Sequence, residues 1–222
     1  MSLADWTKRP RPGQWPLTGP RIVLEPLDWD AHGQALYQVV AAPDIADMWD
    51  YMPMGPFEDY DDFKTILTKI CDFLEWETMV FRKVGTGTVL GMSSFMRIRK
   101  SHGSAEVGCV AFGRALRRTP EATEAMFLMA QHLFDELGYR RYEWKCHNEN
   151  AASRRAAARF GFQFEGIFRN DMVVDGKNRD TAWFAMTDDD WPSVKAAYES
   201  WLMPSNFDAA GQQKRTLESF RS

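Results

Sequence analysis

Two adjacent arginines, Arg117 and Arg118, stand directly before a helix start in the stretch RRTPEATEA (residues 117–125). Thr119 offers a hydroxyl for the helix cap, Pro120 suits the first helical position, and an acid follows in the first turn. A helix start directs free backbone N–H groups and the positive end of a dipole at one point. This arrangement binds phosphate, and arginines strengthen it through charge-assisted hydrogen bonds. The alternative is that both arginines are solvated loop residues.

The composition narrows the classes of protein that fit this sequence. The chain has 222 residues, 45% of them hydrophobic, which is enough for a packed core in one domain. Its net charge of −4 gives no overall basic field, so nucleic acid is not an expected partner. No apolar run approaches the roughly 18 residues of a membrane span, and the N-terminal stretch lacks the apolar core of a signal peptide. We expect a cytoplasmic protein with no membrane partner.

The cysteines give no sign of a metal site. Cys71, Cys109 and Cys146 are scattered and match neither CxxC nor any Cys/His ligand spacing. An odd number at such spacings indicates reduced thiols in the cytosol. We therefore expect no metal.

Hydrophobic periods and turn signals predict an ordered series of elements. Strands are expected at residues 21–25, 78–84, 88–98, 105–112, 141–146, 162–168, 171–174 and 179–186. Helices are expected at residues 28–40, 60–74, 119–137, 150–160 and 192–202. Hairpin turns are predicted at Gly85-Thr86-Gly87 and Asp175-Gly176. Residues 44–56 fit neither period, and the last 20 residues are expected to form a loose polar tail.

The order of these elements favours the α+β class. Antiparallel strands come first, and then one strong helix, a strand, a short helix and further strands. This is not the regular alternation of a doubly wound fold, so we expect a mixed, mostly antiparallel central sheet flanked by helices. The expected organisation is an extended arm at residues 1–20, one domain at 21–187, and a C-terminal helix and tail at 188–222.

Four stretches carry a resemblance to a known family: Ala105-Glu106-Val107-Gly108, residues 117–125, Asn150-Ala151-Ala152-Ser153 and Arg159-Phe160-Gly161-Phe162. From Glu106 to about Met186 the chain resembles the GNAT superfamily of acyl-CoA-dependent N-acyltransferases. Within that superfamily it looks most like the branch of the ribosomal-protein N-terminal acetyltransferases.

The family's pyrophosphate loop, Gln/Arg-x-x-Gly-x-Gly/Ala, is matched at Arg117 and Ala122, and Thr123-Glu124-Ala125 follows as in that branch. The central glycine of this loop is Pro120 here, and another usual glycine is Arg118. Because proline supplies no N–H, one backbone contact to phosphate is lost. Arg118 could replace it with a cation, so we interpret the stretch as a modified pyrophosphate loop for acetyl-CoA.

The resemblance implies acetyl transfer from acetyl-CoA to a primary amine, without a covalent enzyme intermediate. Oxyanion donors are expected on the strand before the loop, around Val110, Ala111 and Phe112. The further residues expected to contact acetyl-CoA are Arg117, Arg118, Thr119, Ala122, Thr123 and Asn150.

Glu106 is the candidate base, because family members often carry one on this strand. Strand alternation puts Glu106 and Gly108 on one face, so the glycine would leave room there for an amine or a water. The alternative is a carboxylate that is exposed to water or paired with an arginine. His102 and His147 are rival proton acceptors, since histidine titrates nearest neutral pH.

The departing thiolate also requires a proton. Many relatives supply it from a tyrosine on the short helix, but the corresponding position here is Ala157. Ser153, one turn away, is the catalytic candidate in its place, as in the ribosomal-type relatives. The alternative is that Ser153 only caps or lines the helix. Asn150 is expected to contact the pantetheine arm and could also cap that helix.

The acceptor is left open. Aromatic and methionine side chains in residues 44–57 suit a partly apolar acceptor, but equally a core or a dimer surface. A protein or peptide N-terminus and a small-molecule amine are both considered, and so is a homodimer. We expect an acetyl-CoA-dependent N-acetyltransferase. The alternative function is a non-catalytic acyl-CoA-binding sensor or assembly module.

Overall fold

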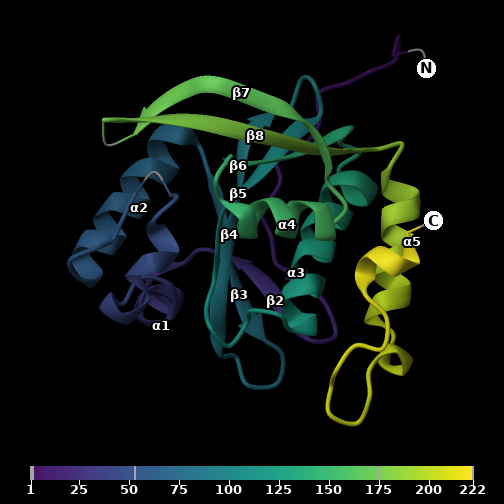
Figure 1. The fold of residues 1–222 in the computed structure, drawn as a ribbon, viewed down its shortest axis with the longest axis horizontal. Coiled ribbons are helices and arrows are strands. Elements are labelled where there is room, and N and C mark those ends of the chain that lie inside the picture. The colour runs from purple at the N-terminus through teal and green to yellow at the C-terminus, as the bar shows by residue number, and fades with distance from the viewer. Residues whose placement is uncertain (1–2, 53, 175, 222) are drawn as a thin grey trace.

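A single mixed sheet forms the centre of the computed structural model, which describes residues 3–52, 54–174 and 176–221 (Figure 1). Its strands are β1 (Leu17–Thr18), β2 (Ile22–Pro26), β3 (Glu77–Lys83), β4 (Val89–Arg99), β5 (Ser104–Phe112), β6 (Arg141–His147), β7 (Gln163–Val174) and β8 (Lys177–Thr187). Their order across the sheet is β1-β2-β3-β4-β5-β6-β8-β7. All neighbours pair antiparallel except β5 and β6, which are parallel. The predicted mixed, mostly antiparallel sheet is therefore confirmed.

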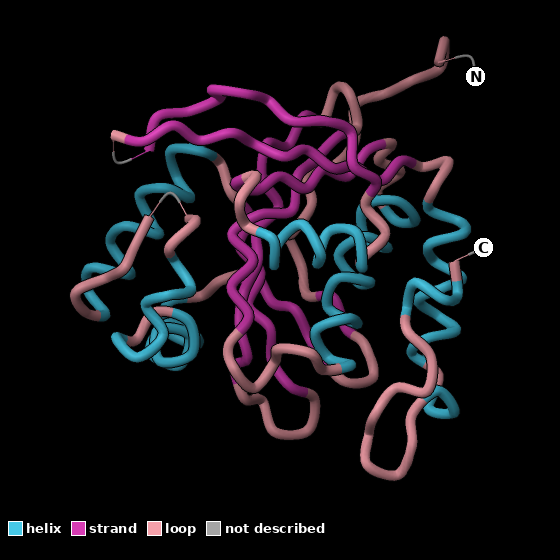
Figure 2. Tube along the Cα trace, viewed as in Figure 1, coloured by secondary structure: helices cyan, strands magenta, loops and turns pink. Residues whose placement is uncertain are grey.

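Helices cover both faces of the sheet, as Figure 2 shows. The first face carries α1 (Trp29–Val40), the 3₁₀ helix η1 (Pro43–Trp49) and α2 (Tyr60–Leu74). The second face carries α3 (Pro120–Gln131), the π-helical turn η2 (His132–Glu136), α4 (Ala151–Arg159) and α5 (Trp191–Leu202). Two short 3₁₀ helices, η3 (Pro204–Asn206) and η4 (Leu217–Phe220), follow α5. None of the helices in the described residues combines the length and the apolar character needed to cross a bilayer.

Each face of the sheet has its own apolar core, because strand side chains alternate between the two faces. Met79 and Phe81 of β3 pack into the core beneath α3 and α5, whereas Val80 between them packs into the core beneath α1 and α2. Burial on both faces explains why the central strands read as nearly continuous apolar runs in the sequence.

The start of α3 is the one that the sequence predicts, but its end differs. The Thr119 side chain accepts a hydrogen bond from the Ala122 N–H at 3.2 Å, and Pro120 takes the first helical position. The regular α-helix stops at Gln131, and the π-helical turn η2 follows in place of the expected continuous helix. Gly138, in the left-handed conformation at φ 67°, then closes the segment.

Two further expectations are corrected. Residues 162–168 and 171–174 were expected as separate strands, but they form one strand, β7, because a bulge shifts its register without ending it. The expected turn at Asp175-Gly176 includes Asp175, which lies outside the described residues. The expected loose tail is wrong for residues 203–221. Leu217 is 1% exposed, and Arg221 donates a hydrogen bond to the Ala158 carbonyl at 2.8 Å.

The burial of Leu217 predicts a measurable cost for its removal. Leu217→Ala should lower the free energy of unfolding by about 2–5 kcal/mol, because it leaves a cavity in the core. Met203→Ala is the matched control. Its side chain is 55% exposed, so the change should stay within about 0.5 kcal/mol. Urea unfolding measures both, and equal effects would show that the C-terminal segment does not pack on the core.

Candidate active site

β5 and β6 diverge partway along their length. Their parallel pairing ends at Val107 and Trp144, whereas β5 continues to Phe112 and β6 to His147. The facing edges of the two strands beyond the last pair therefore form an opening in the sheet. The loop at residues 113–119 follows β5 on one side of this opening, and α4 follows β6 on the other.

The end of β5 directs backbone groups into this opening. Gly113 N–H donates to the Leu90 carbonyl of β4 at 2.9 Å. Because successive residues of a strand point to opposite sides, the N–H and carbonyl of Phe112 point away from β4. The Phe112 carbonyl accepts a hydrogen bond from Arg117 Nε at 3.0 Å. The same alternation turns the Ala111 N–H toward β4. Phe112 is therefore the better placed of these two as an oxyanion donor.

Two β-bulges flank Glu106, one in each of two paired strands. The β5 bulge lies at Cys109 and Val110, and Cys109 has a φ of 48°. The β4 bulge follows Met96, and Arg97 has a φ of 45°. Left-handed backbone is strained in residues other than glycine, and such residues cluster at functional sites. Met96 is the register partner of Glu106, and its side chain lies on the same face of the sheet as the Glu106 side chain. The bulge turns the Arg97 side chain onto that face as well.

The Glu106 carboxylate is buried between two cations. Its side chain is 2% exposed, and its Oε2 lies 3.5 Å from both Arg97 Nε and Lys145 Nζ. Burial raises the pKa of Glu106 from 4.5 to about 7, against the opposing effect of the two cations. A pKa near the working pH suits a general base. The sequence left open whether the Glu106 carboxylate is exposed to water or paired with an arginine. The structure excludes exposure and shows the pairing with Arg97.

Gly108 lies on the same face as Glu106, as strand alternation predicts. A Cβ built on Gly108 would lie 3.3 Å from Glu106 Oε1. The same Cβ would lie only 2.2 Å from Met96 Sδ, so the methionine occupies the room beside the glycine. The prediction of free space there for an amine or a water is therefore corrected. Arg97 and Lys145 both contact Glu106 and both line a cavity that Glu106 itself does not line.

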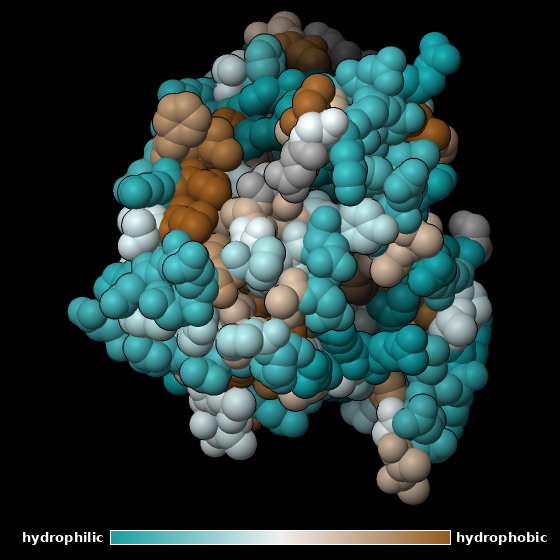
Figure 3. All heavy atoms as spheres, turned by 60° about the vertical axis from the view of Figure 1, so that its left-hand side comes forward, coloured by the Kyte–Doolittle hydropathy of each residue, from teal (hydrophilic) through white to brown (hydrophobic). Residues whose placement is uncertain are grey.

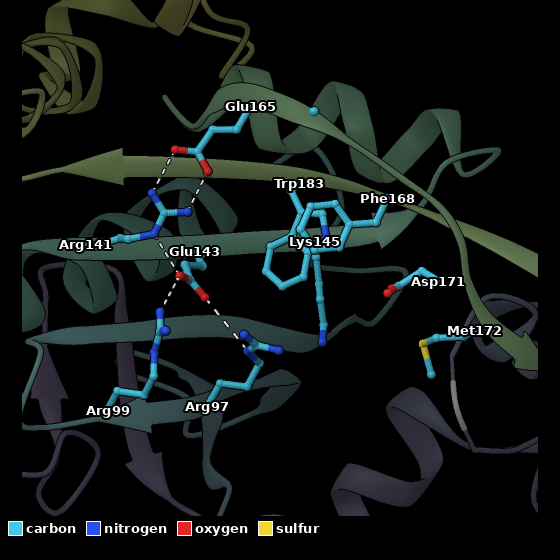
Figure 4. Close-up of a pocket in the computed structure, with 11 residues that line it drawn as sticks. Arg97, Arg99, Arg141, Glu143, Lys145, Glu165, Phe168, Asp171, Met172 and Trp183 are labelled. Atoms are coloured by element: carbon cyan, nitrogen blue, oxygen red, sulfur yellow. Dashed lines mark hydrogen bonds and ion pairs between the residues drawn. The ribbon is translucent and has the colours of Figure 1, made fainter.

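That cavity has a volume of about 610 Å³ (Figure 4). Its lining residues come from β4, β6, β7 and β8, and are Arg97, Arg99, Arg141, Glu143, Lys145, Glu165, Gly166, Phe168, Asp171, Met172 and Trp183. The Trp183 and Phe168 rings, with centroids 5.1 Å apart, form an aromatic wall beside Lys145. A volume of this size is typical of a small-molecule site.

A network of ion pairs fixes one end of the cavity. Glu143, the register partner of Glu106, accepts hydrogen bonds from Arg99 at 2.8 Å and from Arg141 at 2.7 Å. Arg141 also donates to both carboxylate oxygens of Glu165, at 2.8 and 2.5 Å. Arg99 and Arg141 are therefore strongly paired, because their donors meet carboxylates at hydrogen-bond distance.

The loop after β5 contains the left-handed turn that a glycine usually supplies. Arg118 is exposed and has a φ of 64°, which explains why a glycine is common at this position. The Thr119 hydroxyl donates to a loop carbonyl at 2.7 Å and accepts from Ala122, so the Ala122 N–H is already engaged in the cap. Thr123 is buried, and its hydroxyl accepts a hydrogen bond from Arg159 at 3.1 Å. The side chains that this loop leaves available are the two arginines.

The start of α4 lies on the other side of the opening. Asn150 Oδ1 accepts a hydrogen bond from the Ser153 N–H at 2.9 Å, so Asn150 caps the helix. Ser153 Oγ accepts from Trp144 Nε1 at 3.0 Å, which leaves the hydroxyl hydrogen for another acceptor. The buried Cys146 thiol, whose pKa burial raises, is one such acceptor. Ala157 is fully buried, so this position presents no group to the opening.

The two histidines considered as rival bases differ in position. His102 lies in the turn between β4 and β5, at the opposite end of β5 from the loop at 113–119. His147 ends β6 next to the opening, with its ring 5.4 Å from that of Tyr51. His147 Nδ1 accepts the Glu149 N–H at 3.1 Å, so the neutral ring carries its hydrogen on Nε2 and has no free lone pair. Glu106 is the better placed candidate.

Sequence reasoning missed four residues of this site: Arg97, Glu143, Lys145 and Trp183. The β6 sequence RYEWKCH carried a signal for two of them, since charged residues alternate there with apolar ones. The aromatic and methionine residues of 44–57 contribute mainly to the core, because Trp49, Met54 and Phe57 are buried beneath α1 and α2.

Comparisons with known proteins identify the family to which the chain is similar. Residues 21–163 match the family model described as an acetyltransferase (GNAT) domain. A crystal structure of a GCN5-related N-acetyltransferase from Brucella melitensis is 46% identical, with a TM-score of 0.92 over 98% of both chains. A probable acetyltransferase of the GNAT family from Chromobacterium violaceum is 42% identical, with a TM-score of 0.81 over 86% of this chain and 96% of that one.

A more distant structure, Mycobacterium smegmatis RimJ in complex with CoA-disulfide, is 22% identical, with a TM-score of 0.64 over 81% of this chain and 92% of that one. At this identity the similarity establishes the shared fold alone. No curated protein sequence matches the chain.

The raised pKa of Glu106 predicts a pH-dependent effect of Glu106→Gln on stability. Below about pH 4.5 the carboxyl is protonated in the folded and the unfolded chain. Between 4.5 and 7 the unfolded carboxyl ionises first, so the wild type loses stability that the glutamine variant keeps. The free energy of unfolding of the variant, relative to wild type, should rise by about 1–3 kcal/mol across this window. Urea unfolding at pH 4, 5.5 and 7.5 measures it, and a constant difference would contradict the shift.

Proposed function

Because the chain belongs to the GNAT family of acetyltransferases, we propose that it transfers an acetyl group from acetyl-CoA to a primary amine by direct attack, without a covalent enzyme intermediate. The observation that carries this proposal is the buried Glu106 carboxylate, which lies with Arg97 and Lys145 where β5 and β6 diverge. A buried acid with a pKa near 7 beside an opening in the sheet is suited to accept a proton from an amine.

The residues on both sides of the opening fit acetyl-CoA as cosubstrate. Arg117 and Arg118 lie in the loop that ends at the start of α3, where the helix dipole and the arginines together favour a pyrophosphate. Arg117 is held by the Phe112 carbonyl through Nε, which leaves its two terminal nitrogens for a phosphate. The side-chain oxygen of Asn150 accepts the hydrogen bond of the helix cap, so the side-chain NH₂ is left to donate to the pantetheine arm.

The proposed reaction divides among three groups of this chain. Glu106 accepts the proton of the amine, directly or through an ordered water, because burial has raised its pKa toward neutrality. The Phe112 N–H, turned into the opening, stabilises the oxyanion. Ser153 turns its hydroxyl hydrogen from Cys146 to the departing sulfur as a hydrogen bond, since Trp144 occupies only the oxygen, and the thiolate takes up the proton that the amine releases.

For the acceptor, the proposal covers the α-amine of a protein or peptide N-terminus and the amine of a small molecule. The likeness of residues 117–125 to the ribosomal-protein N-terminal acetyltransferases supports an α-amine. We also propose a cytoplasmic location, which is supported by the three free cysteines and the use of acetyl-CoA.

A homodimer is part of the same proposal. β7 forms an edge of the sheet and exposes Phe164, Ile167 and Val173. Figure 3 also shows apolar side chains gathered on the side that carries α1 and α2. An exposed apolar edge strand supports pairing with a second copy of the chain. Light scattering of the purified protein distinguishes one copy from two.

Replacing Arg117 and Arg118 together with alanine should raise the KM for acetyl-CoA by about a hundredfold, because two charge-assisted contacts to the pyrophosphate are lost. Turnover at saturation should change less, because these contacts are made equally in the ground state and the transition state. Arg114→Ala is the control, since Arg114 pairs with Asp44 at 2.9 Å. An unchanged KM for acetyl-CoA in the double variant would show that both arginines are solvated loop residues that do not bind the pyrophosphate.

Glu106→Gln should lower turnover by about 10²- to 10⁴-fold, since it keeps the size of the side chain but removes the base. The KM for acetyl-CoA should hardly change. Glu143→Gln is the matched control, because Glu143 is the buried register partner of Glu106 and is not the proposed base. Equal losses in the two variants, in steady-state kinetics on an amine panel, would assign the effect to the ion-pair network instead.

Ser153→Ala should lower turnover by roughly tenfold if the hydroxyl protonates or solvates the departing sulfur. An acceptor panel with labelled acetyl-CoA provides the rate, and thermal unfolding provides the stability. A lower melting temperature with unchanged turnover would assign Ser153 a structural role through its hydrogen bond from Trp144.

A further inference from the structure

The cations that line the cavity fall into two classes. Arg99 and Arg141 meet Glu143 and Glu165 at 2.8 Å or less, so their charges are neutralised within the protein. Arg97 and Lys145 have longer contacts. Arg97 Nε lies 3.5 Å from Glu106 and 3.9 Å from Glu143, and within the described chain Arg97 donates no hydrogen bond at normal distance.

Arg97 and Lys145 also stand between the cavity and the proposed base. Both line the cavity and both contact Glu106, whereas Glu106 itself does not line it. Arg97 has 44% of its side chain exposed and Lys145 24%, so each can turn toward a ligand. Figure 4 shows Lys145 extending into the cavity. An amine that approaches Glu106 from this cavity therefore passes two positive charges.

The positive charges of Arg97 and Lys145 oppose the approach of an ammonium ion that carries no anionic group. Two like charges about 4 Å apart repel each other more strongly near a protein surface than in water, because the effective dielectric constant is lower there. An anionic group on the acceptor reverses the effect, because a carboxylate matches the fork of Arg97 and attracts Lys145 as well. It would also draw both cations from above Glu106 and so open the route to the base.

The rest of the cavity is apolar on one side. The Trp183 ring is contacted by Arg97 at 5.0 Å and by Lys145 at 5.5 Å, and the Phe168 ring packs against it. Met172, 42% exposed, continues this wall. An apolar or aromatic side chain fits this wall, next to the two cations that would take a carboxylate.

We propose, on the basis of the transferase function above, that the acceptor is a small amino carboxylate with an apolar or aromatic side chain. Its carboxylate pairs with Arg97 and Lys145, its amine faces Glu106, and its side chain packs on Trp183 and Phe168. The proton of the amine goes to Glu106, and the nitrogen–acetyl bond forms as the carbon–sulfur bond breaks. The thiolate of CoA leaves hydrogen-bonded to the Ser153 hydroxyl and takes up the proton that the amine released, which returns Glu106 and Ser153 to their starting states. The product is the N-acetyl amino carboxylate.

The acids of the cavity define the competing acceptor. Glu143 and Glu165 are paired with arginines. Asp171, which lies between Phe168 and Met172 on β7 in Figure 4, lines the same cavity and makes no ion pair within the described residues. A polyamine could place a distal ammonium at Asp171 and would not need Arg97. Spermidine therefore belongs in the test as the opposing probe.

The test measures binding and transfer separately. L-phenylalanine, L-leucine and L-methionine are each titrated calorimetrically against their decarboxylated amines and spermidine, with the protein saturated by CoA. Each amino acid should bind at least about tenfold more tightly than its amine, because only the amino acid has the carboxylate. This preference should fall below about threefold in Arg97→Gln and in Lys145→Met. Arg99→Gln, at a cation of the same cavity that is already paired, should keep it.

The inference is overturned if the amines or spermidine bind as tightly as the amino acids, if no amino acid binds, or if the preference survives in both variants. Release of free CoA from acetyl-CoA is followed with the same compounds. If the decarboxylated amines are acetylated faster than the amino acids, the result supports the transferase function and contradicts the requirement for a carboxylate on the acceptor. A carboxylate-dependent preference in binding with no acetylation of any compound would support the pocket and contradict the transferase.

Discussion

The burial of one carboxylate between two cations is the interaction on which the rest of this site depends. Glu106 sits on a central strand, where a charge is costly unless it is paired. Arg97 and Lys145 supply that pairing from the two neighbouring strands at 3.5 Å, close enough to keep the group ionisable and too far for strong hydrogen bonds. Desolvation outweighs their attraction, so the pKa of Glu106 lies near 7. If the two cations paired with Glu106 more strongly, the carboxylate would stay ionised as a salt bridge and could not accept a proton near neutral pH.

The sheet is shaped around this carboxylate. Parallel pairing of β5 with β6 ends one residue beyond Glu106, at Val107 and Trp144, so the base lies at the edge of the opening. The bulge in β4 brings Arg97 onto the face of Glu106, and the bulge in β5 changes the direction of the strand before Phe112. The neighbouring Glu143 binds Arg99 and Arg141, which keeps their charges away from Glu106. The positions of the base, the oxyanion donor and the phosphate loop thus follow from the path of a single strand.

Much of the fold could be predicted from the sequence, because its signals are local. Thr119 and Pro120 mark the start of α3, and α2 has the predicted bounds of 60–74, since caps and apolar periods act within a few residues. The family resemblance led to Glu106, and the structure adds that it is buried. The sequence correctly predicted the face of the sheet on which Gly108 lies. The free room predicted beside Gly108 is absent, because the side chain of Met96 on another strand fills it.

Other features could not be predicted, for the same physical reason. Alternation would turn Arg97 away from Met96, and only the bulge, a property of strand pairing, puts both on one face. The polar C-terminal residues showed no apolar period, yet Leu217 is buried in the core, and Phe207 and Phe220 pack against it. The roles of Lys145 and Trp183 arise from the pairing of β6 with β8, in which the two residues are register partners. Contacts between distant segments leave no local pattern to read.

The central claim is that burial holds the Glu106 carboxyl near neutrality in the resting protein. Isotope-edited infrared titration of the glutamate carboxyls, taken as the difference between wild type and Glu106→Gln, observes this group alone without relying on any acceptor. We predict a carboxyl that titrates near pH 7 in the wild type and is missing from the variant. A Glu106 carboxyl that titrates near 4.5, as in an unfolded chain, would contradict the account.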